Sequence, residues 1–128
     1  MDKKPVLSES LEDYLETILE LQTLNTVARS KDIAEKLDIK RGSVTGMLKK
    51  LAAQELINYE PYGYVTLTPR GEKIAKEIEN RHVVLRDFLS RFVGVDEKTA
   101  DDTACRMEHA MNAATFKKFK AFIAKLDA

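Results

Sequence analysis

The chain has 128 residues, a length that suits one domain or two small domains sharing a core. It is 44% apolar and 33% charged, and its five Gly and three Pro are too few for a turn-rich all-β fold. Because 21 basic residues balance 21 acidic ones, no overall positive field indicates a nucleic-acid partner.

Cysteine content and hydropathy indicate the compartment. A single Cys excludes an intramolecular disulfide and favours a reducing environment. No apolar run approaches the roughly 18 residues needed to cross a membrane, and none follows the lysines at the start of the chain. We therefore expect no signal peptide, no membrane partner and a cytoplasmic location.

Helical spacing of apolar residues predicts three helices in the first part of the chain. The first begins after Ser8 or Ser10, either of which is a suitable N-cap, and its pattern breaks at residues 23–26. A short helix capped by Ser30 and a third helix over residues 41–53 follow. Two short helices joined by a few residues are typical of a helix-turn-helix.

The apolar period then changes from helical to alternating. Residues 57–60 and 64–67 are predicted to form two short strands around a turn. Thr68 should cap a long helix with Pro69 at its first position, and Gly94 should end it.

Two further helices are predicted in the tail, with Asp96 and Asn112 as their N-caps. The fold class is thus mainly α: a winged helix-turn-helix followed by a helical appendage. We place the first domain at residues 1–72 and the second at residues 73–128. The long helix, 69–93, would bridge the two.

A local charge surplus supports DNA binding. Residues 29–50 hold seven basic residues against three acidic ones, which is typical of a phosphate-binding surface. In the third helix, hydroxyl side chains suit base edges, cations suit phosphates or guanines, and Gly46 would allow the backbone to approach DNA. The side chains expected to contact DNA, the last at the tip of the wing, are Lys40, Arg41, Ser43, Thr45, Lys49 and Tyr62. Taken alone, these charges would more simply be a solvated helix face.

A second group of residues suggests a metal site. Cys105, Glu108 and His109 stand at i, i+3 and i+4, on one helical face. Two carboxylates on the first helix and a histidine in the long helix could join them as mixed ligands for a divalent transition metal. The six candidate ligands are Asp13, Glu16, His82, Cys105, Glu108 and His109.

Each candidate ligand also has a simpler explanation. Asp13 and Glu16 could be a hydrated acidic face, His82 a half-buried core residue, and Cys105 a small hydrophobic residue. The Cys-x-x-Glu-His run is harder to explain away, although it lacks the spacing of a structural zinc site.

Several ordered motifs together resemble one family, that of the diphtheria toxin repressor and the manganese transport regulator. The motifs are residues 12–18, 32–37, 43–45, 67–71, 81–82 and 104–109. The resemblance covers nearly the whole chain, and it is to short members without an SH3-like domain. It implies a homodimeric winged-helix repressor that is activated by Fe(II) or Mn(II) and controls genes of metal uptake. It further implies that the winged helix-turn-helix is a DNA-binding domain and that residues 73–128 are a helical metal-binding and dimerisation domain, whose last two helices form the dimer interface. We therefore expect a homodimer on a pseudo-palindromic double-stranded DNA operator, and no small organic ligand.

The resemblance also implies a hybrid metal site. Five of the candidates match ligands of the manganese-responsive members, but position 105 is Cys, as in the iron-responsive branch, and that branch has Met in place of Asp13. A thiolate is softer than a carboxylate, so we lean towards iron. An additional site of the iron branch would need a carboxylate at Arg86 and an imidazole at Asp101, and a cation such as Arg86 cannot serve as a ligand.

Three other functions remain open from the residues. The chain could be a winged-helix regulator that senses oxidants through Cys105, or a hydrolytic metal centre, or it could hold a purely structural metal. The short chain has neither a Gly-rich phosphate loop nor a His-Glu-x-x-His motif, so we expect no enzymatic activity.

Overall fold

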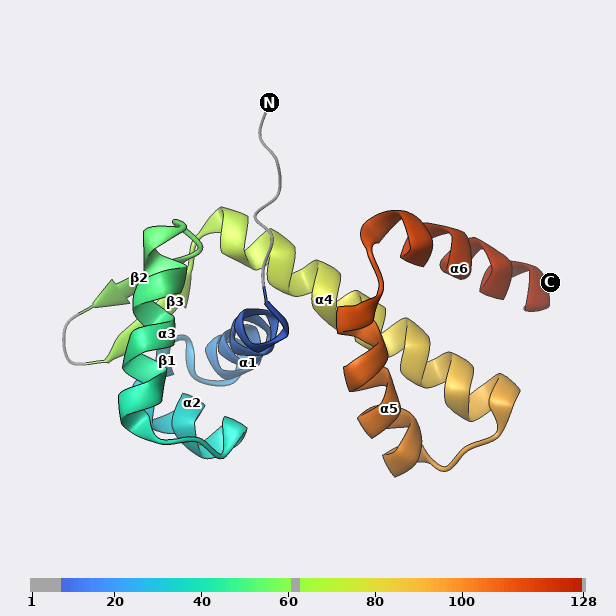
Figure 1. Ribbon diagram of the computed structural model, residues 1–128, viewed down its shortest axis with the longest axis horizontal. Helices are drawn as coiled ribbons and strands as arrows, with labels where there is room; N and C mark the ends of the chain where they lie inside the picture. Colours follow the sequence, from blue (N-terminus) through green and yellow to red (C-terminus); the bar gives the residue numbers. More distant parts are fainter. Residues whose placement is uncertain (1–7, 61–62, 128) are drawn as a thin grey trace. The chain divides into compact units, whose positions relative to one another are not determined.

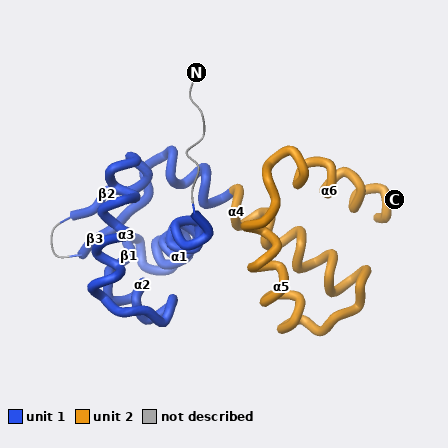
Figure 2. The backbone as a smooth tube through the Cα atoms, in the orientation of Figure 1, with its two compact units in different colours: residues 1–76 blue, residues 77–128 orange. Residues whose placement is uncertain are grey.

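A computed structural model of the protein describes residues 8–60 and 63–127. These residues form two compact units, divided between Lys76 and Glu77 within one long helix (Figure 2). The order of helices and strands confirms the predicted winged helix followed by a helical unit (Figure 1).

The first unit is a three-helix domain with a small sheet. Its elements are α1 (Glu9–Asn25), β1 (Ala28–Arg29), α2 (Ser30–Leu37), α3 (Arg41–Ala53), β2 (Ile57–Glu60), β3 (Tyr64–Leu67) and the first turns of α4 (Pro69–Phe88). The strands are antiparallel in the order β1-β3-β2, with Val65 of the central strand opposite both Ala28 and Tyr59.

The core of the first unit brings the three helices against the sheet. Its fully buried large side chains come from every main element: Leu15, Ile18, Ile33, Val44, Leu48, Leu51, Leu56 and Val65. A polar contact also joins α1 to the sheet, because the Leu67 amide donates to Gln22 Oε1 at 2.8 Å. This packing leaves the opposite face of α3 in solvent.

The second unit is entirely helical. It contains the rest of α4, the π-helical turn η1 (Leu89–Val93), α5 (Glu97–Ala110) and α6 (Ala113–Leu126). Buried Ala100 and Ala104 give α5 a smooth face, and Phe116 and Ile123 are the buried side chains of α6. In the described part of the chain, none of the helices combines the length and apolar character that a membrane span would need.

Four predicted N-caps are confirmed. In each, a side-chain oxygen accepts a hydrogen bond from the amide three residues later, which satisfies one of the unpaired donors of a helix start. The capping residues are Ser8, Thr68, Asp96 and Asn112.

The predicted cap at Ser30 is wrong. Arg29 precedes the helix in extended conformation and Ser30 is already its first helical residue. The reason is a strand contact that local spacing does not reveal: residues 28–29 pair with β3, and the Ser30 amide donates to the Gly63 carbonyl. The residue before the helix is therefore the strand residue Arg29, and α2 begins without a side-chain cap.

Two helix ends also differ from the predicted pattern. α1 continues to Asn25, two residues past the start of the break in its apolar pattern, and stops at Thr26, whose φ is 73°. The long helix widens into η1 before Gly94, which ends it in the left-handed conformation with φ of 85°. The last turn of α1 is exposed, and hydrogen bonds rather than apolar periodicity support it: the Thr23 hydroxyl donates to the Leu19 carbonyl, and the Thr26 amide donates to the Gln22 carbonyl.

Candidate functional site

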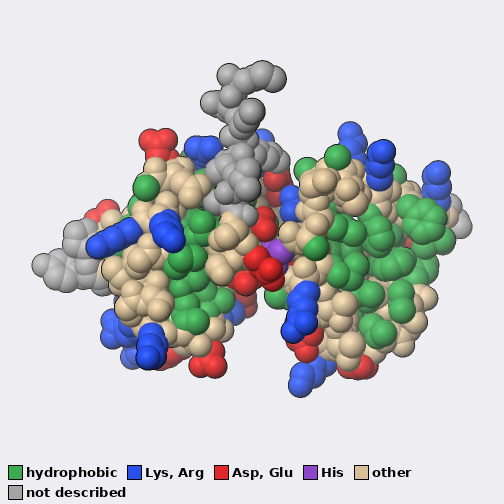
Figure 3. Space-filling model, viewed as in Figure 1, with side chains coloured by type: hydrophobic (Ala, Val, Ile, Leu, Met, Phe, Trp, Pro, Cys, Tyr) green, Lys and Arg blue, Asp and Glu red, His purple; other side chains and the backbone are tan. Residues whose placement is uncertain are grey.

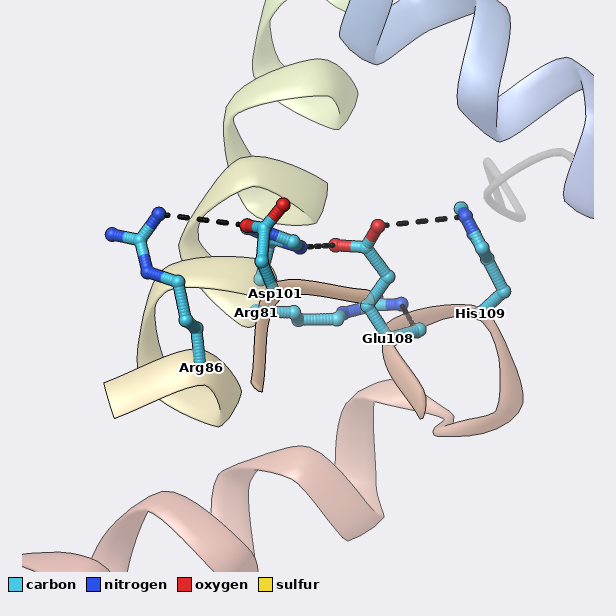
Figure 4. A network of polar contacts seen from close by, with 6 residues as sticks. Arg81, Arg86, Asp101, Glu108 and His109 are labelled. Carbon is cyan, nitrogen blue, oxygen red and sulfur yellow. Dashed lines mark hydrogen bonds and ion pairs between the residues drawn. The ribbon is translucent and has the colours of Figure 1, made fainter. Parts of the chain in front are cut away.

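A group of potential metal-ligand side chains meets within the second unit, and Figure 4 shows two of them, Glu108 and His109. His82 comes from α4, whereas Cys105, Glu108 and His109 come from one face of the last turns of α5. One potential ligand atom from each of Cys105, Glu108 and His109 lies within 4.8 Å of the others, and Glu108 also lies within that distance of His82.

Glu108 is the centre of this group and is fully buried, with 0% of its surface exposed. Its Oε2 lies 3.5 Å from His82 Nδ1, and its Oε1 lies 3.5 Å from His109 Nε2. Neither carboxylate oxygen, nor His82 Nδ1, has a hydrogen-bond partner among the described residues. A buried carboxylate is costly unless a charge or a donor compensates it, so this arrangement calls for a cation.

The same geometry changes the proton affinity of His82. The neighbouring Glu108 carboxylate raises the pKa of His82 to about 9, assisted by Asp101 and opposed by burial of the ring. In the absence of metal, the imidazolium therefore supplies the positive charge beside Glu108 at neutral pH.

The donor set fits a divalent transition metal. It offers two imidazoles, one carboxylate and one thiol, which is a mixture of nitrogen, oxygen and sulfur ligands. The buried oxygens of Glu108 and Nδ1 of His82 are atoms that coordination would satisfy. His82, Cys105, Glu108 and His109 would hold the ion from the second unit.

The other two predicted ligands lie in the first unit. Asp13 and Glu16 stand one turn apart on α1, and both are half-buried. Their assignment as ligands remains a prediction, as does that of the four residues of the second unit.

Three polar residues around this site were not predicted to have a role in it. Asp101 accepts a 2.6 Å hydrogen bond from His82 Nε2, and Arg86 lies 3.7 Å from the same carboxylate oxygen. Arg81 donates to the carbonyls of Glu108 and Met111, at the C-terminus of α5. Helical spacing places each of two of them on the same face as a candidate ligand: Arg86 follows His82 by one turn, and Asp101 precedes Glu108 by two turns.

A second candidate site is the outer face of the helix-turn-helix. Lys40 precedes the first turn of α3, and it is exposed together with Arg41, Ser43 and Lys49. Thr45 is half-buried and its hydroxyl donates to the Arg41 carbonyl. These side chains leave an exposed polar and cationic face opposite the buried one, as a recognition helix requires.

The wing beside this face is attached to the start of α2. The Ser30 amide donates to the Gly63 carbonyl, and the Arg29 guanidinium lies 5.3 Å from the centre of the Tyr64 ring. Tyr62, the predicted wing contact, lies outside the described residues.

Two family profiles together match almost the whole chain. The iron dependent repressor N-terminal DNA binding domain matches residues 6–65, and the iron dependent repressor metal binding and dimerisation domain matches residues 68–128. The boundary between the two matches lies close to the start of α4.

Curated relatives support the same assignment. The chain is 42% identical over 120 residues to an uncharacterised helix-turn-helix transcriptional regulator of Methanocaldococcus jannaschii, covering 93% of this chain and 96% of the relative. It is 41% identical over 103 residues to the transcriptional regulator MntR of Bacillus subtilis, covering 80% of this chain and 72% of MntR.

Solved structures share the fold. The crystal structure of T. acidophilum IdeR matches with a TM-score of 0.77 and 27% identity, over 95% of this chain and 56% of that one. A manganese-dependent transcriptional repressor in complex with manganese matches with a TM-score of 0.80 and 28% identity, over 89% and 52%. The chain therefore spans about half the length of these two proteins. With a helix-turn-helix, a wing and a cluster of potential metal ligands in place, the chain belongs to the iron-dependent repressor family of metal-dependent transcriptional regulators, the family of the diphtheria toxin repressor and the manganese transport regulator.

Proposed function

We propose that this chain is a homodimeric, cytoplasmic repressor whose affinity for a pseudo-palindromic operator depends on Fe(II) or Mn(II). The genes that it controls would be those of metal uptake. The observation that carries the proposal is the pair of buried Glu108 oxygens beside His82 Nδ1, none of them hydrogen-bonded among the described residues. Buried polar groups without hydrogen bonds are rare in proteins, and titratable groups in such surroundings are frequent at ligand-binding sites.

The proposed ligand set includes residues of both units. Asp13 and Glu16 on α1 would hold the ion together with His82, Cys105, Glu108 and His109. A bound divalent cation would supply the positive charge that these acidic groups need in order to lie close together. Without it, repulsion between the α1 carboxylates and Glu108 or a Cys105 thiolate would oppose their approach.

The consequence for DNA binding is a matter of position. Two recognition helices of a dimer must lie about 34 Å apart to enter successive major grooves. Ligands contributed by α1 and by α5 would link the DNA-binding unit to the dimerising unit, and so favour the arrangement that matches the operator. By reciprocity, operator DNA should increase the affinity for metal.

An apolar surface supports the homodimer. Figure 3 shows hydrophobic side chains gathered on one face of the second unit, and solvent-exposed apolar patches of this kind commonly form interfaces. The large hydrophobic side chains that are exposed among the described residues of this unit are Val83, Phe92, Val93, Phe122 and Leu126. We expect Phe122→Asp to give monomers in analytical ultracentrifugation, where the unaltered chain gives dimers.

Cys105 is best explained as a ligand. It is half-buried and lies beside Glu108 and His109, and nothing else among the described residues favours the sensing of oxidants. Its soft sulfur favours Fe(II) over Mn(II), so we propose iron as the preferred activator.

The decisive experiment measures DNA affinity with and without metal. DNA selected from a random library in the presence of Mn(II) would be titrated anaerobically with the protein in chelator, Mn(II) or Fe(II). We expect metal to increase affinity by roughly 5- to 150-fold, the usual range of coupling between sites. Glu108→Gln should remove the increase, whereas Glu79→Gln, an exposed residue of α4, should keep it. Equal affinity in chelator and in metal would overturn the proposal.

A further inference from the structure

The two nitrogens of His82 meet two different carboxylates of α5 (Figure 4). Nε2 lies 2.6 Å from Asp101 Oδ1, which is a short hydrogen bond, while Nδ1 lies 3.5 Å from Glu108 Oε2. Because Asp101 and Glu108 are two helical turns apart, they lie on the same face of α5 and contact the ring from opposite sides.

The environments of the two nitrogens are unequal. The Asp101 side chain is 52% exposed and satisfies Nε2, whereas Glu108 is fully buried and leaves Nδ1 without a hydrogen bond among the described residues. An imidazole binds metal through a nitrogen that carries no proton, and the hydrogen bond made by the other nitrogen decides which one that is. Here the hydrogen-bonded nitrogen is Nε2.

Arg86 acts on the same carboxylate. Its Nη1 lies 3.7 Å from Asp101 Oδ1, the oxygen that also accepts from His82. His82 and Arg86 are one turn apart on α4, so the guanidinium draws Asp101 towards the helix that carries the imidazole. An exposed ion pair of this kind contributes little to stability, which leaves orientation of the ring as its main physical effect.

We propose that Asp101 is a positioning residue that holds the proton of neutral His82 on Nε2 and presents Nδ1 as the metal-binding atom, with Arg86 keeping Asp101 in place. This inference rests on the proposed function, since it assigns a role towards the metal that the second unit would bind. It adds two residues of this chain to the site and specifies one atom of His82.

The test compares alanine variants of two neighbouring aspartates. Asp101→Ala removes the acceptor, and Asp102→Ala is the matched control, because Asp102 is also exposed on α5 and is the next residue in the chain. We expect affinity for Mn(II), measured by competition with a chelator, to fall by roughly 10- to 100-fold for Asp101→Ala, as for other residues that orient metal ligands. Asp102→Ala should bind as the unaltered chain does. Asp101→Asn, which keeps an acceptor oxygen, should restore much of the loss.

A spectroscopic measurement identifies the binding atom. The chain contains two histidines, so that ¹⁵N-histidine labelling gives a simple spectrum, and His82→Gln assigns it. With ¹¹³Cd(II) bound, we expect scalar coupling to His82 Nδ1 and a protonated Nε2. The Asp101→Ala protein should show Nε2 in exchange between protonated and deprotonated forms, or coupled to the metal.

The outcomes separate this inference from the proposed function. Coupling of ¹¹³Cd(II) to Nε2 in the unaltered chain, or equal Mn(II) affinities of Asp101→Ala and Asp102→Ala, would overturn the positioning role and leave a metal site standing. If ¹¹³Cd(II) binds without coupling to either nitrogen of His82, the proposed ligand set is itself wrong and the role of Asp101 falls with it.

Discussion

Oε2 of the fully buried Glu108 lies 3.5 Å from Nδ1 of His82, and neither atom makes a hydrogen bond to any described residue. A separation of 3.5 Å is too long for a good hydrogen bond but short enough for strong attraction between opposite charges. In the absence of metal, a proton on His82 is therefore what compensates Glu108, and metal and proton compete for the same place.

This competition predicts a pH-dependent stability for the metal-free protein. The pKa of His82 is raised from 6.5 to about 9, chiefly by Glu108. A pKa that is higher in the folded state gives stability that is fully present below about pH 6.5 and is lost as the pH rises through about 9. We expect the midpoint of urea unfolding to fall over this range, and to fall less in Glu108→Gln. An equal decrease of the midpoint with pH in the two proteins would contradict the interaction between His82 and Glu108.

Replacing Cys105 by Asp should change metal preference. A carboxylate is a harder ligand than a thiolate, so the ratio of Mn(II) to Fe(II) affinity should rise, by roughly tenfold if the effect is as large as those of other changes around metal sites. Anaerobic titrations with both metals measure the ratio. Cys105→Ser serves as the control, because its weak hydroxyl ligand should lower both affinities. An unchanged ratio in Cys105→Asp would remove Cys105 from the ligand set.

Gly71→Ala should destabilise the first unit. Gly71 is buried, and a Cβ at this position would overlap the backbone carbonyl of Leu56, which cannot move aside as a flexible side chain could. Overpacking of this kind costs about 1–3 kcal/mol, measured as a decrease in the free energy of unfolding. Gly42→Ala is the comparison, since a Cβ there meets nothing within 4 Å and should not reduce stability.

Gly46→Ala should have opposite effects on stability and on DNA binding. Gly46 is exposed within α3 and a Cβ there meets nothing within 4 Å, so Ala should stabilise the helix by about 0.5–1 kcal/mol. If α3 lies in the major groove with its backbone close to DNA, the same methyl group should weaken operator affinity. A variant that is more stable and binds equally well would place this part of α3 away from the DNA.

The salt dependence of DNA binding tests the basic face. Lys49 is exposed on α3, and each phosphate contact contributes about 0.9 to the slope of log affinity against log salt. Lys49→Ala should therefore reduce the slope by about 0.9 for each chain bound. Lys36→Ala is a demanding control, because Lys36 belongs to the same basic segment but forms an ion pair with Glu20. The assignment fails if both variants change the slope equally.

Local sequence signals predicted the helices and their caps well. Ser8, Thr68, Asp96 and Asn112 each act within three residues, so their role is visible in a short window of sequence. Local spacing gives the wrong role for Ser30, because the amide of Ser30 is bound by the carbonyl of Gly63, which is distant in sequence. The strand at residues 28–29 was not predicted, since two residues carry no alternating pattern.

The candidate site was predicted less completely. The spacing of Cys105, Glu108 and His109 indicates a shared helical face, but it does not reveal that Glu108 is fully buried with unsatisfied oxygens. That property depends on the packing of α5 against α4, which only coordinates show. The role of Asp101 is also hidden from the sequence, because its contact with His82 joins two helices that are separate in sequence.

The bond between Ser30 and Gly63 has a consequence for how the protein would read an operator. It joins the residue before β3 to the first residue of α2, next to the pairing of β1 with β3, and so opposes movement of β3 relative to the helix-turn-helix. Elements that move together in this way should adapt poorly to a groove displaced along the duplex. Operators should consequently tolerate single base changes within a half-site better than the insertion of one base pair between the segment read by α3 and the segment that lies beneath the hairpin.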